Sequence, residues 1–542
     1  MNSRLRRMVF LMIAVAGNFV LCSCKQFEAA SPEDYIGPKP KNEPNALELA
    51  AASIKPVQKT EPAGPLQITI TDALLMALEN NRSLLVQHFA PQIQRTFERE
   101  ELAVFDPDLL ASVSQSAVKS QSIPRPGLGS RSAFTRDFTA DVTLQQLFPT
   151  GTTLALNGGT DLLSGSFLNE PFDSSRLGIS ATQSLLRGFG PKVNLATVNQ
   201  ARIDTKISQY ELRGFAESLA AQTEETYWNY ALAEKKIQIY EQSLELAQKQ
   251  QQETEERIKI GKLAQSELAA AEAEVALRKE ELINARSSLV QLRLNLLRLL
   301  NSSGDNFWNR TITIKTAPVS PDVRIEEIEP HVQLALLMRP ELNQAKLQLQ
   351  RDELELIKTR NGLLPRLDLF ITLGKTGFAN SFGRSVDRID GPNYDILGGI
   401  NFELPTFNQA AKARDARATF TRNQAKEAIK NLAQLVEVDV RSAYEEIIRA
   451  KEQVTATAAT RRLQEEKLKV ETEKFNVGKS TSLLVAQAQR DFLSSRINEV
   501  SAVVDYLNAF VELYRLEGSL LERRGIACPG REPVKPTDLS EF

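Results

Sequence analysis

The spacing of apolar residues predicts two very long helices. In about 195–260 and about 411–477, apolar residues recur at intervals of three and four with no internal proline, as at Ile237, Tyr240 and Leu244. At ~1.5 Å per residue, about 65 residues extend over roughly 100 Å, which is far more than a compact domain requires. The apolar stripe is narrow, so we expect coiled-coil partners with much exposed surface.

Between the helical segments, apolar residues occupy every second position, which predicts strands with one apolar and one polar face. In water this alternation suits a sandwich, and in a bilayer it suits a barrel wall. The first half of the chain contains more strand sequence, including a predicted turn at 148–151, and the pattern alone leaves open whether the additional hairpin belongs to the wall. The alternating segments lie at 109–113, 138–144, 177–181, 367–373 and 400–404.

This order of helices and strands occurs twice because the chain contains an internal duplication. A constant offset of 217 in the numbering aligns Tyr227 with Tyr444 and continues through the helices on either side of a single glycine. A second offset, of 258, aligns an earlier stretch, including Pro107 with Pro365. The two offsets differ by 41, so the first half has an insertion of that length between Pro107 and Tyr227.

The N-terminus predicts a secreted protein that carries lipid. Three arginines precede an apolar run at 8–21, which is the layout of a cleaved secretory signal. The run leads into Leu21-Cys22-Ser23-Cys24, which resembles a bacterial lipobox, so we expect cleavage after residue 23 and acylation, with palmitate, at Cys24. Cys22 fits less well because Leu21 stands directly before it. An ordinary signal peptide with incidental cysteines is the alternative.

Composition and charge narrow the possible functions. The 542 residues are 42% hydrophobic and 25% charged, as in folded proteins, and a formal charge of -2 gives no basic surface for nucleic acid. His88 and His331 lack metal-ligand spacing, and no Walker, nucleophile-elbow or dinucleotide motif occurs. We therefore expect neither an enzyme nor a metal or cofactor. No segment after the signal has the length of an apolar membrane helix, so any span must consist of strands.

Several motifs resemble those of the TolC family of outer-membrane efflux channels, over about 66–521. Any one of them is weak evidence, but their duplicated order is specific. The two glycine turns, at Gly261 and Gly478, are the most specific, because a glycine ends a helix readily in left-handed geometry. The other motifs are Ala77-Leu78-Glu79-Asn80-Asn81, Phe105-Asp106-Pro107, Gln183-Ser184-Leu185-Leu186 and Leu404-Pro405-Thr406-Phe407.

The resemblance implies a mainly α protein with a β-barrel portion. In the family, strands of three subunits close one outer-membrane β-barrel, which a long periplasmic α-helical coiled-coil barrel continues, and each chain contains two internal repeats. The expected division is a signal peptide over 1–23, a lipid-anchored Pro-rich tether over 24–65, a first helix-strand-helix repeat over 66–315, a second over 316–521 and a C-terminal tail over 522–542.

The resemblance also implies a function, which is passive conduction of exported small molecules by a homotrimer in the outer membrane. The helical tips would dock on a periplasmic adaptor protein, and an inner-membrane pump would supply the energy. The residues expected at the tips, with possible adaptor contact, are Gly261, Lys262, Gly478 and Lys479.

The tunnel entrance is where this chain departs from the family. Members often carry aspartates six and nine residues after the second glycine, whereas this chain has Leu484 and Gln487. Glu267, six residues after Gly261, keeps a carboxylate in the first repeat, either at the entrance or as a solvated acid at a helix N-terminus. A lipid-anchored coiled-coil scaffold or surface adhesin without a pore is the alternative to a channel. It shares the helices but does not explain the duplicated strands.

Overall fold

The computed structural model describes residues 65–121, 132–166, 168, 170–261, 263–301, 307–320 and 327–534. The chain divides into two units, Met1–Glu61 and Pro62–Phe542, and all described residues belong to the second. The predicted signal peptide, Cys24 and nearly all of the predicted tether lie outside the described residues.

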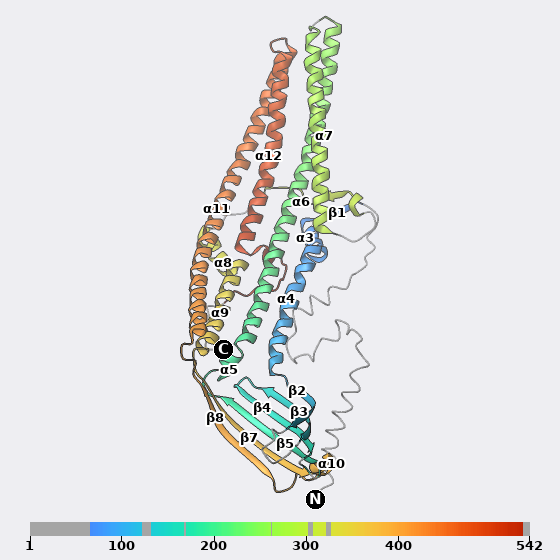
Figure 1. Cartoon of the computed structure of the whole chain (residues 1–542). Helices are drawn as coiled ribbons and strands as arrows, with labels where there is room; N and C mark the ends of the chain where they lie inside the picture. The colour runs from blue at the N-terminus through green and yellow to red at the C-terminus, as the bar shows by residue number, and fades with distance from the viewer. Residues whose placement is uncertain are drawn as a thin grey trace. The chain divides into compact units, whose positions relative to one another are not determined.

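Two antiparallel hairpins, α6 with α7 and α11 with α12, dominate the helical part (Figure 1). The bounds of α6 and α11 lie within two residues of the predicted long helices, which are confirmed. No helix in the described part of the chain is both long and apolar enough to cross a membrane. The helices are α3 (Ile70–Asn80), α4 (Arg82–Leu102), α5 (Pro191–Asn194), α6 (Ala196–Lys259), α7 (Ser266–Leu300), α8 (Ile328–Met338), α9 (Pro340–Asn361), α10 (Phe382–Asp387), α11 (Gln409–Asn476), α12 (Ser482–Glu517) and α13 (Leu520–Arg523), with short 3-10 helices at Ala103–Phe105 and Phe307–Asn309.

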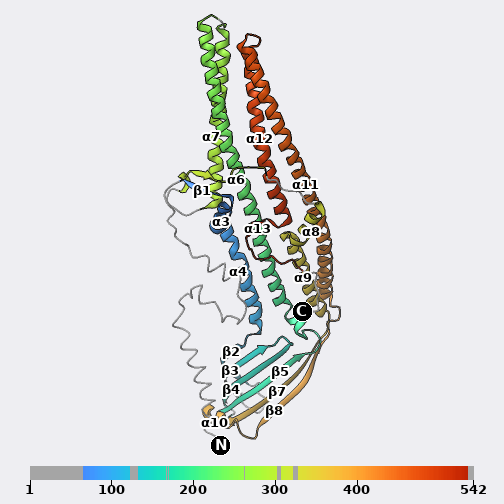
Figure 2. The same cartoon turned by 180° about the vertical axis from the view of Figure 1, so that it is seen from behind.

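The strands form one six-stranded antiparallel sheet in the order β2-β3-β4-β5-β7-β8, beyond the ends of α4 and α9 (Figure 2). A separate two-stranded parallel sheet joins β1 to β6. The additional hairpin of the first half, β3 with β4, lies inside the large sheet between β2 and β5. The strands are β1 (Leu66–Ile68), β2 (Asp108–Gln121), β3 (Ser132–Leu147), β4 (Thr152–Gly165), β5 (Phe172–Ser184), β6 (Ile312–Ile314), β7 (Arg366–Ala379) and β8 (Tyr394–Glu403).

The predicted duplication is confirmed element by element. Both bounds of α8 equal those of α3 shifted by the predicted offset of 258, and the same shift relates β7 to β2. The last residues of α7 and α12 are related by the other predicted offset, 217, as are those of α6 and α11. The same sequence pattern has therefore produced the same local structure twice.

The core lies where the short helices and the small sheet pack against the hairpins. The two halves use equivalent positions, for example Leu296 and Leu513, which align in the duplication and are both buried. The first core includes Ile68, Ala77, Tyr227, Trp228, Leu296 and Leu300. The second includes Ala335, Val440, Ile447, Tyr506 and Leu513. Each hairpin is thus anchored at its base, while its distal half depends on the narrow stripe of the coiled coil.

Asn81 explains part of the first sequence motif. Its side-chain oxygen accepts hydrogen bonds from the backbone N–H groups of Ser83 and Leu84, at 2.9 and 3.2 Å, and caps the N-terminus of α4. Its side-chain NH₂ group donates to the carbonyl of Leu299 at the end of α7, at 3.1 Å. Because Asn81 is buried, these bonds satisfy a polar group that would otherwise destabilise the core. The motif therefore connects the helix before the sheet to the first hairpin.

The large sheet has one apolar and one polar face, and both follow from the strand register. Paired residues of neighbouring antiparallel strands share a face, so a row can be traced across all six strands. One such row is wholly apolar and exposed: Leu109, Leu144, Leu156, Ile179, Leu373 and Ile396. The adjacent row on the other face is mostly polar or small: Leu110, Thr143, Asn157, Gly178, Gly374 and Asp395. The apolar row has no cover in the described chain, which is unfavourable in water.

The predicted turn at 148–151 is confirmed, and it is built into the base of the sheet. Gly151 has a φ of +85° and its carbonyl accepts from the Ser184 N–H at 3.1 Å. Asn194 donates to the Pro149 carbonyl at 2.9 Å, and the Gly190 N–H donates to the Thr150 carbonyl at 3.2 Å. The turn between β3 and β4 is therefore fixed against the segment that leads from β5 into α6.

Substituting Gly151 with Ala should destabilise the protein more than substituting Gly525, the matched control. Both glycines have positive φ, which imposes a strain of about 1–2 kcal/mol on alanine. At Gly151 the new Cβ would also lie 2.3 Å from the Gly188 carbonyl oxygen, whereas no atom lies within 4 Å at Gly525. The additional clash should lower the free energy of unfolding by a further ~1–3 kcal/mol. Thermal unfolding followed by circular dichroism measures this, and equal losses would contradict it.

Candidate functional site: the strand wall and the helical tips

The two long hairpins reverse direction at glycines with the same backbone conformation. Gly261 and Gly478 each have a φ of +75°, and at neither would a Cβ meet another atom within 4 Å. Glycine is therefore required by the left-handed backbone and not by crowding. After Gly478, the N–H of Lys479 donates to the Lys474 carbonyl at 2.8 Å and closes the end of α11. Lys479 is exposed, whereas Lys262 lies outside the described residues.

Arg257 connects the tip of the first hairpin to the tip of the second. Its guanidinium donates to the side-chain oxygen of Asn476 at 3.0 Å and lies 4.8 Å from the centre of the Phe475 ring. Phe475 is buried at 6% exposure, so this cation–π contact is partly shielded from water. Sequence analysis gave no role to these three residues. The feature of the sequence that could have indicated this contact is that each of the three residues lies within four positions of Gly261 or Gly478.

Glu267 makes a second connection between the tips. It lies in the first turn of α7, is half-buried, and accepts a hydrogen bond from the Ser482 hydroxyl at the start of α12. Its carboxylate is thus engaged by the other hairpin as well as by the N-terminal end of its own helix. Leu484, its equivalent at an offset of 217, is exposed on α12, as is Gln487. The structure brings Glu267 and Ser482 together. Because Leu484 has no polar side-chain atom, the second repeat has no equivalent hydrogen bond at this position.

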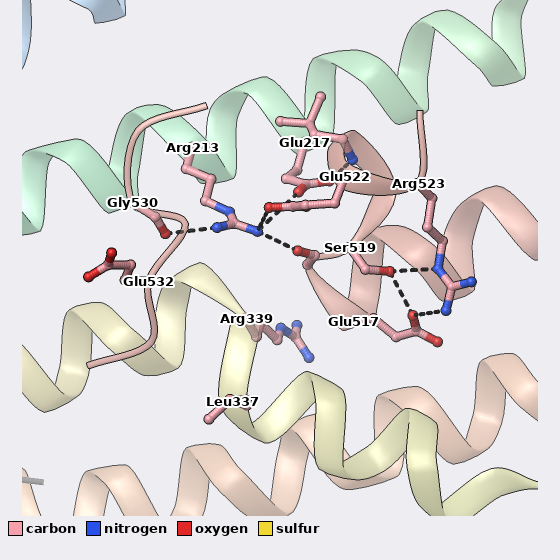
Figure 3. Close-up of polar contacts among 12 residues, drawn as sticks. Arg213, Glu217, Leu337, Arg339, Glu517, Ser519, Glu522, Arg523, Gly530 and Glu532 are labelled. Atoms are coloured by element: carbon pink, nitrogen blue, oxygen red, sulfur yellow. Dashed lines mark hydrogen bonds and ion pairs between the residues drawn. The ribbon is translucent and has the colours of Figure 1, made fainter. Parts of the chain in front are cut away.

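A buried arginine of α6, Arg213, helps to hold the C-terminal segment, 518–534, against this helix (Figure 3). Arg213 is fully buried and donates to the carbonyls of Gly518 and Gly530, at 2.7 and 2.8 Å. It also donates to the Glu522 carboxylate at 2.7 Å. Because a buried guanidinium needs several acceptors, these bonds fix both ends of the segment on the helix.

A second carboxylate shares Arg213. Glu217 lies 3.8 Å from the guanidinium and accepts from the Leu521 N–H at 3.3 Å. Burial raises the pKa of Glu217 to about 7; the charge of Arg213 opposes this rise, and the nearby Glu522 carboxylate adds to it. One arginine therefore does not keep both carboxylates ionised, and Glu217 titrates near neutral pH.

His331 belongs to a neighbouring buried cluster. It is hydrogen-bonded to Glu517, which also accepts from the Ser519 hydroxyl at 2.7 Å and from Arg523 at 3.2 Å. Burial alone would raise the pKa of Glu517, but these donors outweigh it and lower that pKa. His331 is thus a packing residue, joining α8 to the end of α12. In the part of the chain that the structure describes, no group of three His, Cys, Asp or Glu side chains could hold a metal ion.

Comparison with known proteins identifies the family. Residues 139–302 and 331–519 match the family described as outer membrane efflux protein, with one segment in each repeat. These segments cover more than half of the 542 residues. The chain therefore belongs to the outer membrane efflux protein family, and the predicted resemblance is confirmed. A direct comparison with curated protein sequences finds no match.

Solved structures share the fold. The CmeC outer membrane channel of Campylobacter jejuni is 16% identical, with a TM-score of 0.61, over 83% of this chain and 86% of that one. VceC, an outer membrane protein of Vibrio cholerae, is 14% identical, with a TM-score of 0.60, over 83% and 96%. The open state of the MtrE outer membrane channel of Neisseria gonorrhoeae is 18% identical, with a TM-score of 0.57, over 83% and 89%. These structures show the shared fold, and membership of the outer membrane efflux protein family supports a channel subunit over a pore-free scaffold.

The stability of the C-terminal cluster should depend on pH through Glu217. Its pKa is raised from 4.5 when unfolded to about 7 when folded, so the folded state binds the extra proton between these values. The contribution of Glu217 to stability is therefore fully present below pH 4.5 and is lost as the pH rises through about 7, by up to ~3 kcal/mol. Glu217→Gln should remove this loss, whereas Glu225→Gln, at an exposed site on the same helix, should keep it. Melting temperatures between pH 5 and 8 test this, and parallel profiles for Glu217→Gln and the wild type would contradict it.

Proposed function

We propose that three copies of this chain form a passive outer-membrane channel, the outlet of a tripartite efflux or secretion system. The observation that carries the proposal is the combination, in one chain of this family, of an uncovered apolar sheet face with two hairpins built on the exceptionally long helices α6 and α11. In hydrocarbon the apolar face is favourable, whereas in water it would aggregate. Six strands are too few to enclose a lumen, so several copies must contribute.

The polar face of the sheet would line the lumen. Asp137 and Asp141 of β3 lie on this face, as does Asp161 of β4, and the three carboxylates are close enough to affect one another. Such residues are expected on a water-filled wall and would be strongly unfavourable against lipid. They support an aqueous conduit that favours cationic and neutral cargo over anions.

An ion pair crosses the same face above a glycine. Arg176 of β5 and Asp395 of β8 are 2.6 Å apart although β7 lies between their strands. They meet over Gly374, where a Cβ would lie 2.5 Å from Asp395 and 2.6 Å from Arg176. The glycine therefore makes room for a polar bridge that ties three strands together on the lumen side.

The hairpin ends would face the periplasm. Here the turns at Gly261 and Lys262 and at Gly478 and Lys479 form the surface for a periplasmic adaptor, and the inner-membrane pump behind it supplies the energy. Glu267, Leu484 and Gln487 lie near the tunnel entrance. The Arg257 and Glu267 contacts hold the two hairpins of one copy together, which favours a narrow entrance in the resting state.

Conductance through planar lipid bilayers tests the channel and its entrance. Arg257→Ala removes a charge-assisted hydrogen bond and a cation–π contact, together about 2–3 kcal/mol, enough to shift a closed-to-open equilibrium about ten-fold or more. We expect its single-channel open probability or conductance to rise accordingly. Arg286→Ala is the control, because its 2.9 Å ion pair with Glu241 lies within the first hairpin. A trimer with no measurable conductance, even after Arg257→Ala, would refute the channel.

The lipid anchor is a separate part of the proposal. Acylated Cys24, followed by the tether, would attach the chain to the outer-membrane lipid from the periplasmic side. Cys24→Ala should abolish incorporation of labelled palmitate, and Cys22→Ala should leave it intact. Because the strands themselves hold the protein in the bilayer, Cys24→Ala should reduce but not abolish its recovery in the outer-membrane fraction. Labelling that persists in Cys24→Ala and disappears in Cys22→Ala would assign the lipid to Cys22.

A further inference from the structure

The hairpin of β3 and β4 has no counterpart in the second repeat. β2 corresponds to β7 at an offset of 258, and β5 precedes the first long helix as β8 precedes the second. The second repeat passes directly from β7 to β8 through 380–393, which contain only α10. The first repeat has two further strands at this point, and they account for the insertion that the two offsets revealed. One repeat of this chain thus contributes four strands to the large sheet and the other contributes two.

The inserted hairpin is continuous with the sheet on both sides. β3 pairs with β2 over the whole length of β2, and β4 pairs with β5 from Thr152 to Leu163. At ~4.8 Å per strand, β2 and β5 are consequently held roughly 14 Å apart. The turn of the hairpin is fixed at the base of the sheet by the contacts of Gly151 and Asn194 described above. The hairpin is therefore part of the sheet and does not lie over it as a loop.

The hairpin has the same two faces as the strands beside it. Val142, Leu144, Leu154 and Leu156 belong to the exposed apolar face, in register with Ile179 of β5. Its opposite face carries the three aspartates that would line the lumen. A hairpin outside the membrane would not need alternating apolar and polar residues, because water would solvate both of its faces.

We propose that the inserted hairpin is part of the membrane wall, so that three copies close a barrel of 18 strands, with β2 of one copy paired to β8 of the next. This inference rests on the proposed trimeric channel. β2 leaves the helical end of the unit and β8 returns to it, so the two edges meet antiparallel, as all other neighbours in the sheet do. The exposed apolar row extends to both edges, at Leu109 and Ile396, and no strand of the described chain covers either edge.

The size of such a barrel fits the helices of the same chain. Eighteen strands ~4.8 Å apart and tilted by ~40° have a circumference of about 110 Å. Next to the sheet, each copy presents four helices side by side, α4, α6, α9 and α11 (Figure 1). Twelve such helices ~9 Å apart also form a ring of about 110 Å. The wall and the helical tube can therefore join without a change in width.

The wider wall has a consequence for cargo. Barrel diameter grows roughly in proportion to strand number, so 18 strands give a lumen about one and a half times as wide as two strands per repeat would give. The added wall contributes three carboxylates per copy to the lumen. The membrane part is thus suited to bulkier neutral or cationic molecules and would not itself limit their passage.

Cysteine pairs in the full-length chain test the edge contact directly. One cysteine replaces Ala111 or Val113 on β2, and the other replaces Ile396, Gly398 or Ile400 on β8, so that six pairs cover the register between copies. We expect at least one pair to give covalent dimers and trimers on oxidation. Every pair is made in a Cys528→Ala background, because Cys528 is a free and partly exposed thiol.

The matched control uses Val113→Cys with Ala181→Cys. These positions are the first-repeat equivalents of Ile371 and Gly398, which are paired across β7 and β8. If the hairpin lay outside the wall, β2 would pair with β5 and this control would form a bond within one chain. That bond, or intact trimers in which none of the six pairs links, would overturn the inference. Absence of any trimer would instead refute the proposed function.

Polymer exclusion provides a second measurement. Neutral polyethylene glycols added on the side opposite the helices should enter the wild-type lumen up to a limiting radius set by the barrel. Replacing 122–171 with a two-residue Asn-Gly turn should lower that radius by about a third, since diameter follows strand number. An unchanged limit would contradict the inference. If this variant does not assemble, the cysteine pairs still decide.

Discussion

In hydrocarbon, every backbone N–H and C=O group of a strand must be paired, and the rest of this structure depends on that constraint. The large sheet satisfies it internally at four of its six strands, and β2 and β8 each leave one edge unpaired within the chain. The exposed apolar row makes water unfavourable for the sheet, and the open edges make lipid unfavourable for a single copy. Only an assembly that joins the edges meets both requirements. Folding and oligomerisation are therefore linked in this architecture.

The helical part meets a different requirement, which is to remain in water while extending far from its core. Each hairpin is anchored by a buried cluster near its base, where Tyr227 and Tyr506 lie, and becomes polar toward its tip. Toward the tips, the contacts between the two hairpins include polar ones such as those of Arg257 and Glu267. A tube built this way is stable at its base, and its tips need little free energy to move. The distribution of apolar residues along one helix thus sets where the protein is rigid.

Much of the fold could be predicted because it is encoded locally and encoded twice. Helix length, the strand regions and the duplication all follow from short-range spacing. The inter-hairpin contacts could not be predicted in this way, since Arg257 and Asn476 are 219 residues apart and equivalent positions in the two repeats differ in chemistry. Glu267 was found through its spacing from Gly261, but its partner Ser482 was not, because a serine after a turn usually serves as a helix cap. The position of the added hairpin within the sheet could not be predicted from alternation alone, because it depends on which strands pair with one another.

That hairpin shows how this kind of wall can change. A chain that leaves the helices through β2 must return to them through β8, so its strand number has to be even. Insertion of one strand would place the second repeat on the wrong side of the membrane, whereas insertion of a hairpin leaves both ends of the sheet, and all the helices, where they were. Pore width in a threefold assembly can therefore evolve only in increments of six strands, each acquired through a single local insertion. Within this chain, one repeat has taken such a step and the other has not.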